Sequence, residues 1–328
     1  MVKVGYMDPR HLDLLRELAD RGTLTAVASA THRTPSAVSQ QLRSAEREAG
    51  MPLVAPHGRG LRLTRAGSVL AEGAVEVASA IERVQARLDE LRDAPVGSVS
   101  VAALPSAAEV LLPELLDRLG QTELDVVVHD VDVAEAEFAA LAADHDVVIG
   151  HTITGTVGAR SDRLARRVLV EEPLDIALPR GHRLAGRHHL TPELVVGERW
   201  IGVPEGYPFD TVVIAVENAT GRRAERVQRV RDNRLVEAMV ARGLGIALLP
   251  RFTTRPRVDV VLKPLVGVRA SRRLLALSRR DVAERVAVRT VLDALAEIAS
   301  DAAGLARHDE PAAPDGDEFP PVSGSSSV

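Results

Sequence analysis

Two short helical patterns, separated by a tight polar break, occupy residues 24–46 of the chain. The second pattern opens with Thr34-Pro35, which is typical of a helix start, because threonine caps free amide groups and proline suits the first helical position. Apolar residues then recur at i, i+4 and i+7, as Val38, Leu42 and Ala45. The remaining positions are polar and include Ser36, Ser39, Gln40, Gln41 and Arg43. The pattern predicts a helix that packs on a small core along one face and meets a partner along the other.

The flanking residues complete a small domain. A first helix is expected between Pro9 and Gly22, and a second helix is expected after the capping residue Thr23. Residues 53–64 form two short apolar arms around a Gly-Arg-Gly tip, which favours a hairpin or wing. Three helices followed by a wing predict a winged helix-turn-helix.

A helix of this kind can read DNA. In a helix-turn-helix the start of the second helix enters the major groove, where hydroxyl and amide side chains meet base edges. Ser36, Ser39 and Gln40 occupy such positions here. Free amide groups beside Thr34 suit a phosphate, and arginines that position the protein on the DNA backbone are expected at Arg43, Arg59, Arg62 and Arg65. A three-helix domain that docks on another protein is the alternative that spacing alone leaves open.

Charge is unevenly distributed along the chain. Residues 1–65 hold ten basic and six acidic residues, a net charge of +4, whereas the remainder carries −9. A basic head on an acidic body favours a polyanionic partner for the head alone. The absence of cysteine excludes disulfides and thiol chemistry, and 2% aromatic residues argue against a base-stacking single-strand binder. Neither an apolar run of about 18 residues nor a secretory leader is recognised, so a cytoplasmic location is expected.

Residues 66–92 predict one long helix with a heptad seam. Its apolar positions are spaced alternately by four and three residues, at Leu70, Ala74, Val77, Ile81, Val84, Leu88 and Leu91. A helix of this length spans about 40 Å at ~1.5 Å per residue, too far to be covered by the small N-terminal domain. The helix is therefore interpreted as a dimerisation linker.

From Ser98 onward the chain alternates between strand and helix patterns. Strands are expected over residues 99–104, 124–130, 146–150, 174–178, 200–203, 246–249 and 274–277, and helices over 105–119, 133–143, 234–242 and 283–303. This alternation is typical of an α/β fold with mainly parallel sheets. Residues 306–328, rich in proline, glycine, serine and acidic residues, are expected to be disordered.

In combination these segments resemble the LysR-type transcriptional regulators. The matching stretches are HLDLLRELADRGTLTAVA from His11, TPSAVSQQLRSAE from Thr34, GRGLRLTRAGSVL from Gly58 and RGLGIALLP from Arg242. The resemblance implies three parts: a winged helix-turn-helix (1–65), a coiled-coil linker helix (66–92) and a periplasmic-binding-protein-like effector domain (98–305). The effector domain would comprise subdomain I, residues 98–160 and 266–305, and subdomain II, residues 161–265.

The resemblance also assigns residues to the DNA contact. Carried over by position, the base-reading face comprises Pro35, Ser36, Ser39 and Gln40, with Thr34 near a phosphate. Three positions depart from the family pattern: Arg33 replaces an apolar residue, Ala45 replaces leucine, and Val54-Ala55-Pro56 replaces Phe-Glu-Arg. The changes at Ala45 and Val54 thin the core of the domain, and the last change also removes a basic residue of the wing.

An effector is expected at the C-terminal ends of strands, where the loops of an open α/β sheet form its ligand site. The candidates are the helix start at Pro105, Ser106 and Ala107, which suits a carboxylate, and the loop residues His151, Thr152, Val203, Pro204 and Phe209. For each of them an ordinary loop residue is the alternative. No cofactor is expected, and no metal, because no histidine shows ligand spacing.

These observations predict a regulator that binds double-stranded DNA as a homodimer or homotetramer, responds to a small molecule, and acts on RNA polymerase without contact with a membrane. Closure of the effector cleft would change the angle between paired winged domains. An enzyme is disfavoured, because the sequence shows no nucleophile elbow, metal cluster or phosphate loop. A solute-binding protein without DNA activity is the alternative, but it would leave the basic head and the heptad seam unexplained.

Overall fold

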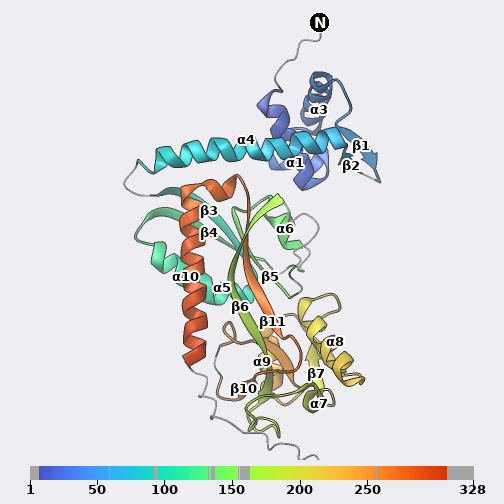
Figure 1. Cartoon of the computed structure of the whole chain (residues 1–328), viewed down its shortest axis with the longest axis vertical. Helices are drawn as coiled ribbons and strands as arrows, with labels where there is room; N and C mark the ends of the chain where they lie inside the picture. The colour runs from blue at the N-terminus through green and yellow to red at the C-terminus, as the bar shows by residue number, and fades with distance from the viewer. Residues whose placement is uncertain are drawn as a thin grey trace, which may run out of the picture.

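A computed structural model of the chain shows three consecutive parts (Figure 1). It describes residues 7–58, 60–91, 95–131, 133, 137–153, 155, 163–255 and 257–308. A small helical domain with a wing lies at one end, the long helix α4 runs across that end, and a two-lobed α/β body lies below it (Figure 1). The predicted wing residue Arg59 lies outside the described residues, as do residues 309–328 of the predicted tail. Residues 306–308, which were also expected to be disordered, instead continue the C-terminal helix.

The N-terminal domain has the three helices and the hairpin that the sequence predicts. They are α1 (Pro9–Arg21), α2 (Leu24–Ala30), α3 (Pro35–Ala49), β1 (Val54–His57) and β2 (Gly60–Leu63). The side chains of Asp8, Thr23 and Thr34 each accept a hydrogen bond from a backbone N–H two or three residues later, which fixes the three helix starts. Strands β1 and β2 pair antiparallel, so the wing is a hairpin.

The core of this domain is small but closed. Leu15, Val38, Ala45 and Leu53 are fully buried. Glu46 ties α3 to the chain before the wing, since its carboxylate accepts a hydrogen bond from the Leu53 N–H at 3.0 Å. Ala45 therefore belongs to the core as the apolar seam predicts, with a side chain smaller than the leucine usual in the family.

Helix α4 (Arg65–Asp89) begins at Thr64, whose hydroxyl accepts a hydrogen bond from the Gly67 N–H and donates one to the carbonyl of Pro52. The helix approaches the wing so closely that a Cβ on Gly67 would stand 2.1 Å from the carbonyl oxygen of Leu53. Only glycine fits there without a backbone shift.

Most of the heptad seam lies on an exposed face of α4. Ile81, Val84 and Leu88 are 61%, 66% and 51% exposed. Ser79 and Ala86 are buried, and Arg83, at the same helical spacing, pairs with Glu284 of the body. The seam of α4 is therefore left open while another face of the helix rests on the body.

One lobe of the body is a sheet covered by helices. Its strands are β3 (Val96–Ala103), β4 (Glu123–Asp130), β5 (Val147–Thr152) and parts of the long strands β6 (Leu164–Pro179) and β11 (Ser271–Arg279). Its helices are α5 (Pro105–Leu119), the short α6 (Phe138–Leu141) and α10 (Val286–His308), which is preceded by the turn η3 (Val282–Glu284). The helix expected over 133–143 is thus only one turn long in the described residues, because residues 142–144 form a turn before β5.

The other lobe is built on the far part of β6. It adds the strands β7 (Arg199–Gly202), β8 (Glu225–Arg229), β9 (Ala247–Pro250) and β10 (Val260–Lys263). Its helices are α7 (Pro192–Val195), α8 (Pro208–Thr220) and α9 (Asn233–Ala241). Trp200, Val216 and Leu174 are among the residues that form its separate core.

Two expectations about the body are corrected. Strands β6 and β11 pair antiparallel with each of their neighbours, so the sheets are mixed and not mainly parallel. In addition, residues 164–173 pair with β11 in the first lobe, and Leu174 onward pairs with β9 in the second. The crossing between lobes therefore lies near Pro173 and not at residue 161, because one continuous strand makes it.

Candidate DNA interface and effector site

The start of α3 presents polar side chains to solvent. Three of the four predicted base-reading residues are exposed and the last is half-buried: Pro35, Ser36, Gln40 and Ser39. The Ser39 hydroxyl accepts a hydrogen bond from the Arg43 guanidinium at 2.9 Å, so a cation lies beside the predicted reading residues. The hydroxyls of Thr34 and Ser36 are 3.1 Å apart. The first two turns of α3 thus display hydroxyls, an amide and one guanidinium together.

Gln41 points toward the domain and not toward solvent. Its amide N–H donates to the carbonyl oxygen of Arg10 at 2.5 Å, and its amide oxygen accepts from Arg33. Arg33, which departs from the family pattern, therefore links the turn to α3 through Gln41. Arg62 of the wing and Arg65 at the start of α4 are exposed, as a contact with phosphates requires.

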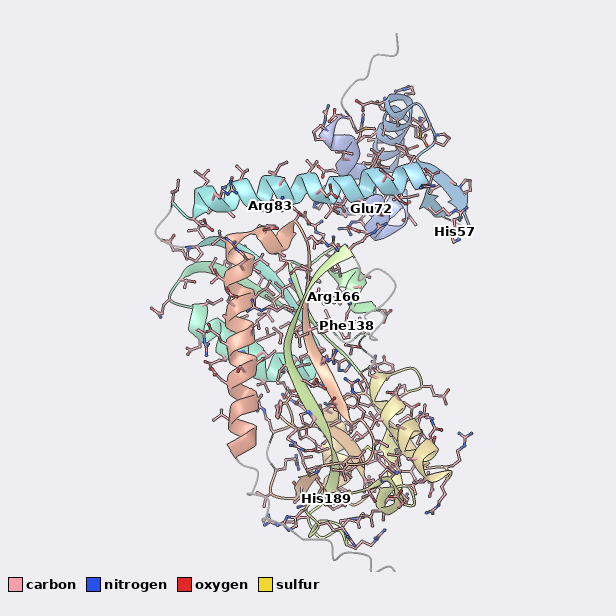
Figure 2. All side chains as sticks on the ribbon, in the orientation of Figure 1. His57, Glu72, Arg83, Phe138, Arg166 and His189 are labelled. Carbon is pink, nitrogen blue, oxygen red and sulfur yellow. The ribbon has the colours of Figure 1, made fainter. Side chains whose placement is uncertain are left out.

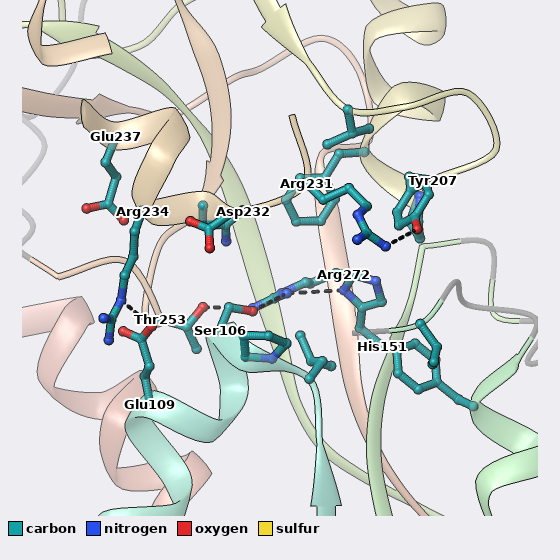
Figure 3. Close-up of a pocket in the computed structure, with 18 residues that line it drawn as sticks. Ser106, Glu109, His151, Tyr207, Arg231, Asp232, Arg234, Glu237, Thr253 and Arg272 are labelled. Carbon is teal, nitrogen blue, oxygen red and sulfur yellow. Dashed lines mark hydrogen bonds and ion pairs between the residues drawn. The ribbon is translucent and has the colours of Figure 1, made fainter. Parts of the chain in front are cut away.

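A cavity of about 120 Å³ lies between the two lobes (Figure 3). Helix α5 reaches it from one lobe and helices α8 and α9 reach it from the other, while β5 and β11 supply its floor. The lining includes three aromatic rings, Phe138, Tyr207 and Phe209. It also includes the charged residues Glu109, Arg231, Asp232, Arg234 and Glu237.

Arg272 lines the floor of the cavity and forms a buried ion pair with Glu172, which is not itself part of the lining. Arg272 and Glu172 are 1% and 0% exposed, and the guanidinium Nη2 lies 2.8 Å from the carboxylate. Glu172 also accepts hydrogen bonds from the backbone N–H groups of Phe252 and Thr253. These bonds satisfy the carboxylate, as a buried ion pair requires, because both charges have left water. The floor is therefore polar but carries no net charge.

Arg272 also contacts His151, whose pKa is shifted first by burial and then by the charge of this arginine. Its Nη1 donates to Nδ1 of His151 and to the Ser106 hydroxyl, each at 3.1 Å (Figure 3). Burial, together with the charge of Arg272, lowers the pKa of His151 to about 3, so the ring is neutral at physiological pH. Since Nδ1 accepts, the single ring proton is on Nε2. The ring is held between Phe138 and Phe209, with centroids 5.9 Å and 5.8 Å away.

The structure brings five of the eight predicted effector residues to this cavity: Pro105, Ser106, His151, Val203 and Phe209. The other three lie elsewhere. Ala107 is fully buried in the core of the first lobe, and Thr152 is buried with its hydroxyl accepting from the Gly155 N–H. Pro204 uses its carbonyl to hold the turn before α8.

Sequence reasoning missed Arg272 of β11, Thr253 in the turn after β9 and Glu237 in the middle of α9. All three line the cavity but lie outside the loops that were expected to hold the effector. One signal was available for part of this set. Doublets of opposite charge, Glu171-Glu172 and Arg272-Arg273, stand next to the apolar patterns of two expected strands, and opposite charges on neighbouring strands favour a pair.

Helix α1 of the N-terminal domain also contacts the body. Three ion pairs make this contact: Arg16 with Asp281, Glu17 with Arg279, and Arg21 with Asp144. Strand β11 runs from Arg272 at the cavity to Arg279 at the contact with α1. Beside it, β5 joins His151 to the turn that holds Asp144. Two paired strands therefore connect the cavity to the DNA-binding domain.

The histidines do not converge on a metal site within the described residues. His57 lies in the wing and His189 at the opposite end of the molecule (Figure 2). No group of three or more histidine, aspartate or glutamate residues in the described part of the chain has the arrangement of a metal site. Among the described helices, none combines the length and the apolar character that a membrane span needs.

Two family models match the chain. The model described as bacterial regulatory helix-turn-helix protein, lysR family, matches residues 9–68, and the LysR substrate binding domain matches residues 92–300. The chain belongs to the LysR family of transcriptional regulators. As a LysR-type regulator it combines a DNA-binding domain with an effector-binding domain, and the α3 surface and the Arg272 cavity lie one in each.

Individual members of the LysR family are similar at low identity. A hydrogen peroxide-inducible genes activator of Escherichia coli O6:H1 is 24% identical over 265 residues, which cover 79% of this chain and 85% of that protein. The solved structure of a Corynebacterium glutamicum OxyR C206 mutant matches with a TM-score of 0.56 at 19% identity, over 93% of this chain and 96% of that one. Full-length CbnR complexed with its target DNA matches with a TM-score of 0.50 at 21% identity, over 89% and 100%. These structures share the fold.

Proposed function

We propose that this LysR-type regulator reads its operator with the exposed start of α3. The observation that carries the proposal is the cluster of Ser36, Ser39 and Gln40 at the surface, on a helix whose other face closes the domain core. Pro35 completes the set. Arg43, Arg62 and Arg65 would contact the DNA backbone, as would Arg59 of the wing tip, and the capped helix start at Thr34 would face a phosphate.

Pairing of two chains is proposed along the seam of α4. Exposed apolar side chains at heptad spacing favour a second copy of the same helix as their cover. A homodimer made this way would present two α3 helices to two half-sites about 34 Å apart, so the operator would be a rough palindrome. Two such dimers could associate into a tetramer.

The cavity around Arg272 is proposed as the effector site. Its place between two lobes that are joined by long strands suits a ligand that draws the lobes together. A change in lobe angle would act on β11 and β5, and through Arg279, Asp281 and Asp144 on helix α1. The effector would thus shift the equilibrium between two orientations of the DNA-binding domain.

Binding, and not catalysis, is the proposed use of the cavity, since Arg272 in its floor is already paired with Glu172. The regulator would work in the cytoplasm, with its output passed to RNA polymerase. The Escherichia coli relative is named for induction by hydrogen peroxide, but this chain contains no cysteine. Thiol oxidation is therefore not proposed as its signal.

A gel-shift titration tests the proposal. DNA fragments that flank the gene for this chain are incubated with the full-length protein at several salt concentrations. The proposal expects one fragment to bind specifically, with an affinity that falls as salt rises, because phosphate contacts release counterions. Absence of salt-sensitive binding to every flanking fragment would contradict it.

A further inference from the structure

One acidic side chain of the cavity lacks a partner among the described residues. Glu237, on α9, lines the cavity and is 8% exposed, yet it forms neither a hydrogen bond nor an ion pair with the described residues. Two arginines approach it, but both are committed to other carboxylates. Arg257 holds Asp259 with two hydrogen bonds of 2.9 Å, and Arg234 lies 2.6 Å from Glu109. Burial accordingly raises the pKa of Glu237.

A carboxyl that is largely buried and unpaired loses part of its hydration, so its charged form is stabilised when a ligand pairs with it. Such a group suits a ligand that brings a positive charge or N–H donors. The neighbouring charges support this reading. Arg234 is neutralised by Glu109, and the side chain of Asp232 accepts from the Leu235 N–H as the cap of α9. Arg231, the third arginine of the lining, donates to the Tyr207 hydroxyl. Asp232 is held as the cap of α9, whereas Glu237 has no hydrogen bond with the described residues, so Glu237 is the acid on this side that a ligand cation would pair with.

The opposite side of the cavity offers donors without net charge. Ser106 accepts from Arg272, so its hydroxyl hydrogen can be donated to a ligand, and His151 carries its proton on Nε2. Both lie beside the start of α5, which has no side-chain cap and whose amide groups and dipole favour an anion. Figure 3 shows Glu237 well apart from Ser106 and His151. A ligand that meets both sides must therefore carry its two groups some distance apart.

We propose that the effector is a small amino acid whose amine is remote from its carboxylate. The carboxylate would lie at Ser106 and His151, the protonated amine would pair with Glu237, and a short aliphatic chain would pass the ring of Phe209. A cavity of about 120 Å³ suits a molecule of roughly ten non-hydrogen atoms, on the basis of the volume that one water needs. The inference rests on the proposed role of this cavity as the effector site.

Calorimetric titration of the full-length protein with three probes tests the inference. δ-Aminovalerate carries both groups, valerate lacks the amine and pentylamine lacks the carboxylate. We expect δ-aminovalerate to bind at least ~10-fold more tightly than either, because each charged hydrogen bond contributes about a factor of ten or more. Glu237→Gln should lower the affinity for δ-aminovalerate by ~10-fold and leave that for valerate unchanged. Glu225→Gln, at an exposed position on β8, is the matched control and should change neither.

Equal binding of valerate and δ-aminovalerate would overturn the inference, as would an affinity that Glu237→Gln does not change, or no binding of any probe. A thermal unfolding curve of Glu237→Gln accompanies the titration, and we expect it to be at least as stable as the parent. The same samples are assayed for operator binding. If the protein binds its operator but the calorimetric titrations contradict the expected affinities, only the proposal of an amino acid effector is rejected. If the parent protein does not bind any operator, the proposed function is rejected.

Discussion

His151 shows how one residue can make the stability of the body depend on pH. Its pKa is lowered to about 3 by burial and by Arg272, whereas a histidine in an unfolded chain titrates near 6.5. The unfolded chain therefore takes up a proton as pH falls below about 6.5, and the folded chain does not. The stabilisation is complete above that pH and is lost progressively toward pH 3.

The variant His151→Gln tests this effect, because glutamine can still accept from Arg272 but does not titrate. Between pH 7 and pH 5 we expect its free energy of unfolding to fall by about 2 kcal/mol less than that of the parent protein, from 1.36 kcal/mol per pKa unit. Urea unfolding at the two pH values measures the difference. The same loss in both proteins would show that His151 is not the group responsible.

At the scale of elements, helix α4 can pack close to the chain before the wing only because residue 67 is glycine. A Cβ on Gly67 would collide with the carbonyl oxygen of Leu53, whereas a Cβ on Gly73, in the same helix, would meet nothing within 4 Å. We expect Gly67→Ala to destabilise the protein by about 2 kcal/mol through overpacking. Gly73→Ala should stabilise it by up to ~1 kcal/mol, since alanine favours a helix. Thermal unfolding of both variants shows whether alanine stabilises or destabilises the protein at each position.

The seam of α4 makes a prediction about assembly. Replacing Ile81 and Val84 by glutamate should turn the dimer into a monomer, because charges cannot be buried between two paired helices without partners. Analytical ultracentrifugation gives the mass. Glu76→Lys, an exposed change of charge off the seam, is the control and should leave the dimer intact. A dimeric Ile81→Glu, Val84→Glu variant would show that another surface pairs the chains.

Elements with local signals could be predicted from the sequence. The caps at Thr23 and Thr34, the glycine-rich tip of the wing and the heptad spacing of α4 each fix an element through neighbouring residues alone. Helix α8 could not be predicted in this way. Residues 212–216 are all apolar, and Ile214 among them lies on the exposed face, so the sequence lacks the contrast between two faces that marks a surface helix.

At the scale of the whole molecule, the sequence does not reveal contacts between distant segments. Glu172 and Arg272 are 100 residues apart, and Arg16 and Asp281 are 265 apart. Nothing local selects these partners, because each pairing depends on how β6 and β11 cross between lobes. The cavity could therefore be predicted from its loops, through Ser106, His151 and Phe209, but not from the charged residues of its strands.

The contact between α1 and the body predicts a measurable coupling. Arg16 and Asp281 have side chains only 14% and 9% exposed, so their ion pair is largely shielded from water. A double-mutant cycle with Arg16→Gln and Asp281→Asn should give a coupling free energy of about 1–2 kcal/mol in chemical unfolding. The exposed pair Arg167 and Asp293, 41% and 64% exposed, is the control and should give less than about 0.5 kcal/mol. A coupling no larger than the control would mean that α1 does not rest on the body in solution.

The reading of DNA by α3 is tested most directly by the sequence preference of a double variant. Ser39→Arg with Gln40→Ala changes two exposed or half-buried side chains of α3 without touching its core. Selection of bound DNA from a randomised library, at fixed salt, compares the variant with the parent. We predict a changed preferred sequence, with salt-sensitive non-specific binding retained because Arg62 and Arg65 remain. An unchanged preferred sequence would contradict the assignment of the reading face.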